Sequence, residues 1–285
     1  MTSQPRTRPQ NQTNTQGRAH TSEGASLLTV RSMTKAFGGR KVLEGIDFDV
    51  RAGELVAFLG ANGSGKSTTL RCVMGLTEPD EGMVLLGGQN LSELKGHQRQ
   101  AARHQAAMVF QKIHLVPRRT ALQNVCAGAL ARMGTAQSLS PAFYPREIKE
   151  EAMGCLERVG LADRAHDRAG SLSGGQQQRV AVARALCQRA KVLLADEPVS
   201  ALDPRAAEQV MHLLRDLAHS ENLAVAAVLH QPDLARRHAD RAIGLVQGRM
   251  LFNHPAHELS EDDLDLLYLP DRAPADAHHL MEKTA

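Results

Sequence analysis

The sequence predicts an α/β fold in which a phosphate-binding loop joins a buried strand to a helix. Three observations carry this prediction. Residues 60–68 fit the phosphate-loop pattern G-x-x-x-x-G-K-[ST]. The apolar residues 55–59 before them have the length of a strand, and residues 67–74 after them read as the start of a helix. Residues 191–197 form a second strand, so apolar that it indicates a parallel sheet covered on both faces.

The predicted phosphate loop consists of Gly60, Ala61, Asn62, Gly63, Ser64, Gly65, Lys66, Ser67 and Thr68. Its glycines let the backbone wrap around phosphates with N–H groups pointing inward, and the positive end of the following helix adds to this anion site. Lys66 can reach the β- and γ-phosphates, and the Ser67 hydroxyl can hold Mg²⁺. The alternative is a glycine-rich turn that binds nothing, but the strand, the spacing, the lysine and the serine all favour the phosphate loop.

The composition of the chain argues against several classes of protein. The 285 residues carry a net charge of +3, and Arg6, Arg8 and Arg18 account for it within an acid-free N-terminal stretch. A globally basic nucleic-acid binder is therefore not indicated. The four cysteines form no C-x-x-C pair, which suggests neither a zinc site nor a disulfide framework and fits a reducing cytoplasm. No apolar run approaches the ~18–20 residues of a membrane-spanning helix, and no signal-peptide pattern is present.

An antiparallel β piece is expected ahead of the phosphate loop. Residues 1–25 are polar and poor in aliphatic side chains, so we expect a disordered tail. Residues 27–31 and 46–50 read as strands, and residues 37–40 read as a turn. Phe37 in that turn is placed to stack on an adenine ring. The alternative for Phe37 is a core position at the end of a strand.

A helical insertion is expected within the α/β domain. Residues 83–86 and 106–110 read as strands, the second ending at Gln111, and the character changes at residue 112. Residues 120–131 and 146–159 have helical apolar spacing, and residues 133–145 between them look like a loop. We therefore predict a helical subdomain over about residues 112–170. Arg118 and Arg119 within it either form a solvated face or contact a partner protein.

Residues 172–176, Leu-Ser-Gly-Gly-Gln, open a helix that is expected to run to about residue 189. Ser173 is a natural N-cap for this helix. Gly174 and Gly175 are poor helix formers, but they allow close approach by a phosphate. The alternative is an ordinary cap preceded by a glycine-rich turn.

Polar side chains follow the later strands. The strand over residues 191–197 ends in Asp196 and Glu197, at the sheet edge where α/β ligands bind. A turn at residues 200–204 leads into a helix to about residue 220, and the strand 224–229 ends at His230. A lone histidine is most often structural, but His230 follows a strand end as Gln111 and Glu197 do, which favours a functional role. A strand pair at 241–246 and 249–252, a helix at 261–268 and a frayed tail at 269–285 complete the chain.

This order of motifs resembles the nucleotide-binding subunit of ATP-binding cassette (ABC) transporters over about residues 26–268. The Leu-Ser-Gly-Gly-Gln pentapeptide at this spacing makes the resemblance specific. It implies a P-loop NTPase core with an antiparallel β subdomain and an inserted helical subdomain, binding ATP and Mg²⁺. In that arrangement Phe37 stacks on adenine and residues 60–68 cradle the phosphates. Ser67 and Gln111 hold Mg²⁺, with Asp196 supporting it.

The resemblance also implies the catalytic roles and a dimer. Glu197 orients and polarises the attacking water, and His230 contacts the γ-phosphate, with Lys66 and Gln111 completing the catalytic set. Two chains face each other across two ATP molecules, so that hydrolysis requires a homodimer. The residues that contact the facing subunit's ATP, or lie at that interface, are Ser173, Gly174, Gly175, Gln176 and Asp203.

A finer resemblance is to the ATP-binding subunit of bacterial phosphonate importers. It is carried by residues 110–116, 124–125, 128–130, 195–199, 229–235, 239–245 and 267–268. Gln123 departs from the usual Glu, residues 199–202 mix the general and the importer form, and the N-terminal tail is extra. None of these departures falls on a residue of the predicted ATPase site.

The resemblance implies a peripheral protein at the cytoplasmic face of the bacterial inner membrane. Its partners are a second copy, an integral membrane permease docked near Gln111 and the helical insertion, and indirectly a periplasmic substrate-binding protein; no nucleic acid is expected. Other cargoes stay open, namely phosphate, phosphite, an amino acid or a lipoprotein. A soluble cassette ATPase acting on DNA or ribosomes is a third reading, disfavoured by the single phosphate loop and by an insertion without sustained heptads.

Overall fold

A six-stranded sheet forms the centre of the computed structural model, which describes residues 25–268. The strand order is β10-β9-β3-β8-β7-β6; β10 is antiparallel to β9, and the other neighbours are parallel. Side chains of β7 and β8 are buried throughout, as the apolar runs predict for a sheet covered on both faces. The strands are β3 Glu54–Leu59, β6 Ala106–Val109, β7 Val192–Asp196, β8 Ala224–Val228, β9 Arg241–Val246 and β10 Arg249–Pro255.

The predicted antiparallel β piece is a second sheet, in the order β2-β1-β4-β5. It also takes in strands that follow the phosphate loop in sequence. Its members are β1 Ser26–Phe37, β2 Arg40–Arg51, β4 Glu81–Leu86 and β5 Gln89–Asn90. β1 continues well beyond residue 31, so the prediction that Phe37 lies in the turn is wrong. Phe37 ends β1 opposite Arg40, and the turn itself is Gly38-Gly39, where φ is 55° and 81°.

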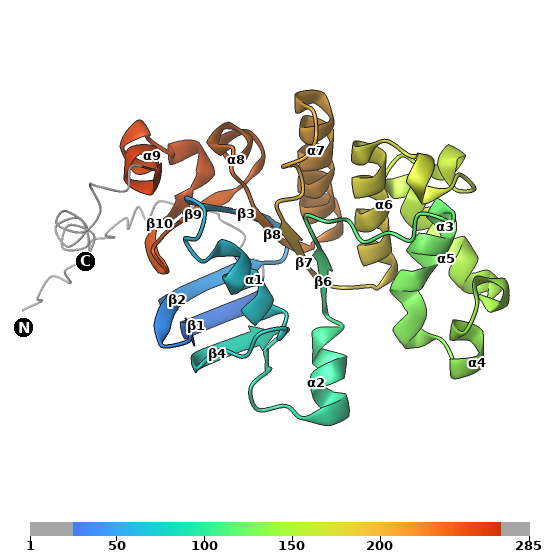
Figure 1. Cartoon of the computed structure of the whole chain (residues 1–285), viewed down its shortest axis with the longest axis horizontal. Helices are drawn as coiled ribbons and strands as arrows, with labels where there is room; N and C mark the ends of the chain where they lie inside the picture. The colour runs from blue at the N-terminus through green and yellow to red at the C-terminus, as the bar shows by residue number, and fades with distance from the viewer. Residues whose placement is uncertain (1–24, 269–285) are drawn as a thin grey trace, which may run out of the picture.

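Two apolar cores lie on the two faces of the central sheet. Alternate side chains of β3 point to opposite faces: Val56 and Phe58 pack toward the antiparallel sheet and α1, whereas Leu55, Ala57 and Leu59 pack toward the other helices. Figure 1 shows this layering, with β1, β2 and β4 below the central sheet and α7, α8 and α9 above it. The helices are α1 Lys66–Val73, α2 Gly96–Arg103, α3 Ala121–Cys126, α4 Thr135–Ser138, α5 Arg146–Arg158, α6 Gly174–Cys187, α7 Pro204–Glu221, α8 Pro232–His238 and α9 Glu261–Tyr268.

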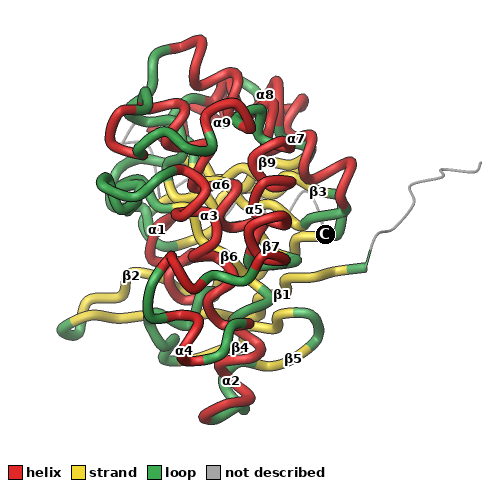
Figure 2. Tube along the Cα trace, turned by 90° about the vertical axis from the view of Figure 1, so that its right-hand side faces the viewer, coloured by secondary structure: helices red, strands yellow, loops and turns green. Residues whose placement is uncertain are grey.

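The stretch predicted as a helical insertion, residues 112–170, leaves the sheet after β6. In Figure 2 it faces the viewer, and α3 and α5 pack together with α6 in both views. Thr120 and Gln123 form a capping box that starts α3. The first predicted helix is α3 continued by a 3-10 helix over Ala127–Arg132. Residues 133–145 are not only a loop, because they contain α4 and a 3-10 turn at Pro141–Phe143.

Two short helices, α2 and α8, were not anticipated from the sequence. The expected disorder of residues 1–24 and 269–285 lies outside the described residues. Among the helices between residues 25 and 268, none is long and apolar enough to cross a bilayer.

Candidate active site

The carboxyl ends of four neighbouring parallel strands carry most of the predicted site residues. The phosphate loop follows β3, His230 lies just beyond β8, Asp196 ends β7 with Glu197 behind it, and Gln111 lies just beyond β6. Because β3, β8, β7 and β6 are adjacent in that order, residues far apart in sequence meet along one edge of the sheet. This edge is where ligands bind in open α/β sheets.

The phosphate loop has a backbone that few residues other than glycine adopt. The φ angles of Gly60, Gly63 and Gly65 are 146°, 80° and 107°. A Cβ atom at Gly60 would lie only 2.2 Å from the carbonyl oxygen of Leu245. The turn between β9 and β10 holds the loop in place, since Gly248 N–H donates to the Ser64 carbonyl oxygen at 3.0 Å. Local crowding and backbone conformation therefore require glycine at these positions, apart from any role in phosphate binding.

Lys66, the first residue of α1, is 4% exposed. Its Nζ donates to the carbonyl oxygens of Gly60 at 2.8 Å and Ala61 at 2.9 Å. Burial lowers the pKa of Lys66, and the nearby carboxylates of Glu197 and Asp196 oppose that shift. The ammonium group is thus held by carbonyl dipoles rather than by a carboxylate, which leaves its charge uncompensated by direct contact.

Ser67 and Asp196, two of the three residues predicted to hold Mg²⁺ together with Gln111, are in contact. The Ser67 hydroxyl donates to Asp196 Oδ1 at 2.8 Å, and Asp196 is 8% exposed. Burial raises the pKa of Asp196, and the negative charge of Glu197 adds to the increase, whereas the Ser67 hydrogen bond, Arg71 and Lys66 oppose it. A buried carboxylate in this setting is stabilised by a cation. A hydroxyl, a carboxylate and the Gln111 amide oxygen are hard ligands that fit Mg²⁺.

Glu197 is held from two sides. His230 Nε2 lies 2.6 Å from Glu197 Oε1, and Gln111 Nε2 donates to Glu197 Oε2 at 2.8 Å. The φ angle of Glu197 is 52°, which is unusual for a residue with a Cβ atom and is typical of functional sites. Sequence reasoning missed Ser200, whose hydroxyl lies 3.3 Å from Gln111 Nε2 and donates to the Glu197 carbonyl oxygen. Ser200 could have been identified from the sequence because it lies only three residues after Glu197.

The Leu-Ser-Gly-Gly-Gln segment starts α6 as predicted. Ser173 and Gln176 form a capping box, with reciprocal hydrogen bonds of 3.3 and 2.9 Å. A Cβ atom at Gly175 would lie 3.0 Å from the Cβ of Ala206, so this glycine permits close packing of α6 on α7. Ser173 and Gly174 are exposed. Figure 1 places α6 and α1 on opposite sides of β6. The Leu-Ser-Gly-Gly-Gln segment and the phosphate loop of the same chain therefore lie apart from each other.

Asp203 and Phe37 lie at exposed positions. Asp203 caps α7, because its Oδ1 accepts the Ala206 N–H at 2.9 Å. The Phe37 ring is 51% exposed, with Lys35 Nζ 5.3 Å from its centroid. The alternative of a core phenylalanine is therefore wrong, and the ring is free to stack on a ligand.

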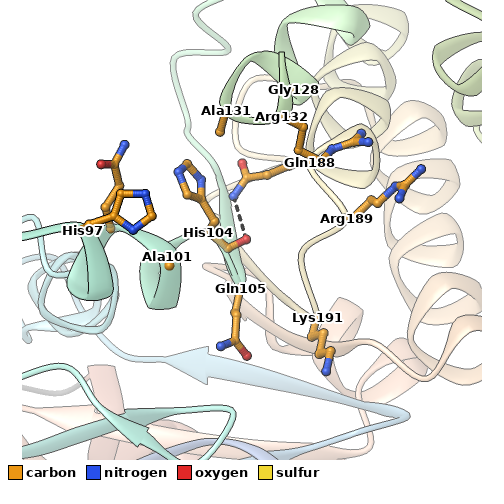
Figure 3. A pocket seen from close by; sticks show the side chains of 11 residues that line it. His97, Ala101, His104, Gln105, Gly128, Ala131, Arg132, Gln188, Arg189 and Lys191 are labelled. Carbon is orange, nitrogen blue, oxygen red and sulfur yellow. Dashed lines mark hydrogen bonds between the residues drawn. The ribbon is translucent and has the colours of Figure 1, made fainter. Parts of the chain in front are cut away.

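Among the pockets that border the helical insertion within residues 25–268, one lies beside Gln111 and another beside the end of α6. The first, of about 310 Å³, is lined by Gln111, Gln177 and residues between 113 and 117, together with Ala169 and Gly170. The second, of about 390 Å³, is shown in Figure 3. It separates α2 from the end of α6, and its lining includes His97, His104, Arg132, Arg189 and Lys191. No predicted site residue lines this second pocket.

Comparisons with known proteins identify the family of the chain. The family model described as ABC transporter matches residues 43–200. A phosphonates import ATP-binding protein of Frankia casuarinae is 46% identical over 234 residues, covering 82% of this chain and 92% of the relative. A hypophosphite import ATP-binding protein of Stutzerimonas stutzeri is 43% identical, covering 88% and 73%. A phosphate-import ATP-binding protein of Mycolicibacterium smegmatis is 44% identical, covering 85% and 92%.

Solved structures show the same fold. The cbiO1 protein of Clostridium perfringens, part of an ABC transporter complex, superposes with a TM-score of 0.73 at 26% identity, covering 90% of this chain and 99% of that one. A dimeric bacterial ABC transporter cassette superposes with a TM-score of 0.69 at 32% identity, covering 81% and 100%. The family model spans more than half of the chain, and the relatives match along most of their length. The chain belongs to the ABC transporter family, as one of its ATP-binding cassettes.

Proposed function

We propose that this protein is the ATPase subunit of a bacterial importer for a phosphorus oxyanion, with phosphonates as the first cargo to test. The observation that supports the ATPase part most strongly is the convergence of Lys66, Asp196, Glu197, Gln111 and His230 on one edge of the central sheet. Phosphoryl transfer requires positioning and charge neutralisation, and this edge offers both.

ATP binding follows from the phosphate loop and its surroundings. The backbone N–H groups of residues 60–68 and the N-terminus of α1 attract the phosphates, and Lys66 exchanges its carbonyl contacts for phosphate oxygens. Phe37 stacks on the adenine ring. Ser67 and Gln111 supply oxygen ligands for Mg²⁺, and Asp196 fixes the Ser67 hydroxyl. When bound, the ion neutralises charge on the β- and γ-phosphates.

Glu197 acts on the attacking water. Its carboxylate accepts a hydrogen bond from the water, which raises the electron density on the oxygen that attacks the γ-phosphorus. His230 Nε2, 2.6 Å from Glu197 Oε1, keeps the carboxylate in place and contacts the γ-phosphate. Lys66 and His230 together stabilise the negative charge on the transferred group.

The exposed start of α6 favours a composite site. Ser173 and Gly174 present a helix N-terminus to solvent, with Gly175 half-buried behind them, and the capping hydrogen bonds join only Ser173 and Gln176. A facing subunit's ATP completes such a site, with the γ-phosphate on the Ser173 end of α6. Asp203, at the exposed start of α7, lies in the same interface. The active form is therefore a homodimer with two shared ATP sites.

A membrane permease is the expected partner, because an import ATPase needs a component that spans the bilayer. We place the docking site at the pocket beside Gln111 and the helical insertion. A displacement of Gln111 at this docking site would act on Glu197 directly, since Gln111 Nε2 donates to the Glu197 carboxylate. The protein would then act at the cytoplasmic face of the inner membrane, held there by the permease.

The names of the relatives limit the cargo to one chemical class. Relatives named for phosphonates, hypophosphite and phosphate are 43–46% identical to this chain, and further relatives of 41–45% identity are named for phosphonates, which favours phosphonates as the first cargo to test. The three share a phosphorus oxyanion. This shared class ranks above the amino-acid and lipoprotein alternatives. A soluble cassette ATPase is disfavoured, since these relatives are all named as import proteins.

Growth on single phosphorus sources tests the cargo. Deletion of the gene is expected to abolish growth on an alkylphosphonate, with growth on ample phosphate unchanged. Parallel cultures on hypophosphite, phosphite and limiting phosphate identify the cargo if phosphonate growth persists. Complementation with the wild type, but not with Glu197→Gln, ties the phenotype to hydrolysis. Growth of the deletion strain on all four sources, in a host without a second such system, would contradict the oxyanion class.

A further inference from the structure

The end of β1 that carries Phe37 has little support from neighbouring strands. Pairing between β1 and β4 stops at Thr34 and Glu81, before β1 reaches Phe37. On the other edge of β1, the register with β2 shifts both before and after Lys35. Strand pairing alone therefore does not hold the last residues of β1, at 35–37, in one position.

Asp80, which precedes β4, contacts three successive residues of β1. Its N–H donates to the Thr34 carbonyl oxygen at 2.9 Å. Its carboxylate accepts hydrogen bonds from Lys35 Nζ at 2.7 Å and from the Ala36 N–H at 2.6 Å. The Lys35 ammonium, together with the Ala36 N–H, holds the pKa of Asp80 below its usual value, so the carboxylate stays charged at neutral pH. Asp80 thus supplies the pairing that β4 no longer provides.

The Lys35 side chain connects Asp80 to the ring of Phe37. Residues two apart on a strand share a face, and Lys35 Nζ lies over the Phe37 ring, 5.3 Å from its centroid. A cation in this position is attracted to the face of the ring. The Lys35 side chain is only 14% exposed, whereas Phe37 is 51% exposed. The ammonium group therefore covers one face of the ring, and the opposite face is left for a base.

This end of β1 borders the phosphate loop. Lys35 lies opposite Leu43 of β2. A Cβ atom at Gly65 would lie 2.7 Å from Leu43 Cδ2 and 3.1 Å from the Val42 carbonyl oxygen, so the loop packs directly on β2. Phe37 comes two residues after Lys35 on the same strand. The base of a nucleotide whose phosphates lie in the loop can therefore extend to the Phe37 ring.

We propose that Asp80 is a positioning residue for the nucleobase: it fixes Lys35 on one face of the Phe37 ring and so presents the other face to adenine. The inference rests on the proposed ATPase function and deepens it, because it assigns part of the affinity for the base to a residue outside the phosphate loop. Asp80 acts on the base alone, whereas the loop binds the triphosphate independently. An ordinary surface ion pair would affect neither part of the nucleotide.

Asp80→Ala tests this role with two ligands, ATP and inorganic tripolyphosphate, which has no base. The wild type is expected to bind ATP more tightly than tripolyphosphate, since a base stacked on an aromatic ring adds affinity. In calorimetric titrations, Asp80→Ala is expected to bind ATP about three- to tenfold more weakly and tripolyphosphate as the wild type does. The KM for ATP rises accordingly, with kcat at saturation within about twofold, because Asp80 does not contact the reacting atoms.

A double variant shows whether Asp80 acts through Phe37. Phe37→Ala is expected to lower ATP affinity by about 5- to 150-fold, the range for one stacked base. Adding Asp80→Ala to Phe37→Ala is then expected to cause no further loss, because the ring that Asp80 positions is gone. Losses that add in the double variant would show that Asp80 acts independently of the ring and would overturn the proposal.

Two further variants control the experiment. Glu81→Ala removes an exposed carboxylate from the next residue of the chain and is expected to bind both ligands as the wild type does. Asp80→Asn keeps an acceptor for the Ala36 N–H but removes the charge that holds Lys35. Its ATP affinity is expected to lie between those of the wild type and Asp80→Ala, and it serves as the test if Asp80→Ala does not fold.

The outcomes separate this inference from the ATPase proposal. Wild-type ATP affinity in both Asp80 variants would overturn the role of Asp80 and leave the ATPase proposal intact. An equal loss of affinity for ATP and tripolyphosphate, together with a lower melting temperature, would do the same, because it indicates a structural role. Failure of the wild type to bind either ligand would contradict the ATPase proposal itself.

Discussion

His230 Nε2 lies 2.6 Å from Glu197 Oε1, and this contact joins the ends of β8 and β7. The other oxygen of the same carboxylate accepts a hydrogen bond from Gln111, beyond β6. Three adjacent strands thus supply one cluster, in which the carboxylate proposed to act on water is oriented by both neighbours. Glu197 reaches this position in a left-handed backbone conformation, with φ of 52°. The following predictions test the residues around it.

Lys66→Ala is expected to weaken ATP binding by about 10- to 100-fold, the range for a hydrogen bond to a charged group. ATPase activity should fall to near background, since the same charge stabilises the transition state. Calorimetric binding and phosphate release measure the two effects. Lys95→Ala, at an exposed lysine before α2, serves as the control and should behave as wild type. Normal hydrolysis by Lys66→Ala would sink the phosphate-loop assignment.

Glu197→Gln keeps the side-chain shape and removes its charge. We expect ATP to bind and hydrolysis to fall by about 10²- to 10⁴-fold, as for loss of a general base. If bound ATP joins two subunits as proposed, the variant should elute as a dimer on a sizing column with ATP and as a monomer without it. Glu157→Gln, at an exposed glutamate of α5, should hydrolyse ATP normally. A Glu197→Gln protein that stays monomeric with ATP counts against the shared-site dimer.

Ser173→Arg tests the composite site. Its own phosphate loop is untouched, so ATP binding to the single chain should be normal, whereas hydrolysis should fail because a bulky cation replaces the cap of α6. Mixing Ser173→Arg with Lys66→Ala yields heterodimers in which one ATP site carries both lesions and the other carries neither. Partial recovery of activity on mixing is the expected result if each site fires alone. Loss of ATP affinity in Ser173→Arg by itself contradicts the separation of the two features.

We expect Asp196→Asn to be more stable than the wild type but to have lower ATPase activity. Burial raises the pKa of Asp196, so the folded protein holds the proton more tightly than the unfolded chain does. The free energy of unfolding therefore falls as pH rises above about 4, the usual carboxyl pKa, and continues to fall until pH passes the raised value. Asparagine avoids this loss.

We accordingly expect Asp196→Asn to melt about 2–4 °C above the wild type at pH 7.5 for each kcal/mol gained, and to lose most of that advantage near pH 4. The Mg²⁺-dependent ATPase activity should drop, because Ser67 loses a charged partner. Melting curves at several pH values without nucleotide measure the first effect. Asp262→Asn, at an exposed residue of α9, should show neither change. A wild type more stable than Asp196→Asn at pH 7.5 would refute the argument from burial.

Much of the site could be predicted because short-range rules determine it. The phosphate loop, the cap at Ser173 and the buried strand before Asp196 each depend on neighbouring residues, so motif and periodicity located them. Helices without a clear hydrophobic period were not predicted. In α2 only Ala102 is buried, which leaves no apolar stripe to detect, and α8 has only seven residues, too few to show a period. The extent of β1 was missed because pairing with β2 and β4, not local composition, carries the strand on to Phe37.

The sequence by itself predicts that this chain binds nucleotide through residues 60–68, and it determined which side chains follow the strands of the sheet. Only the tertiary structure decided which of them touch. The order of β3, β8, β7 and β6 is a long-range property. It brings Glu197 into contact with Gln111, 86 residues earlier in the sequence, and with His230 at the end of the neighbouring strand. A local pattern records propensity and spacing, whereas contacts of this kind arise when the chain closes its sheet and the helices pack on it.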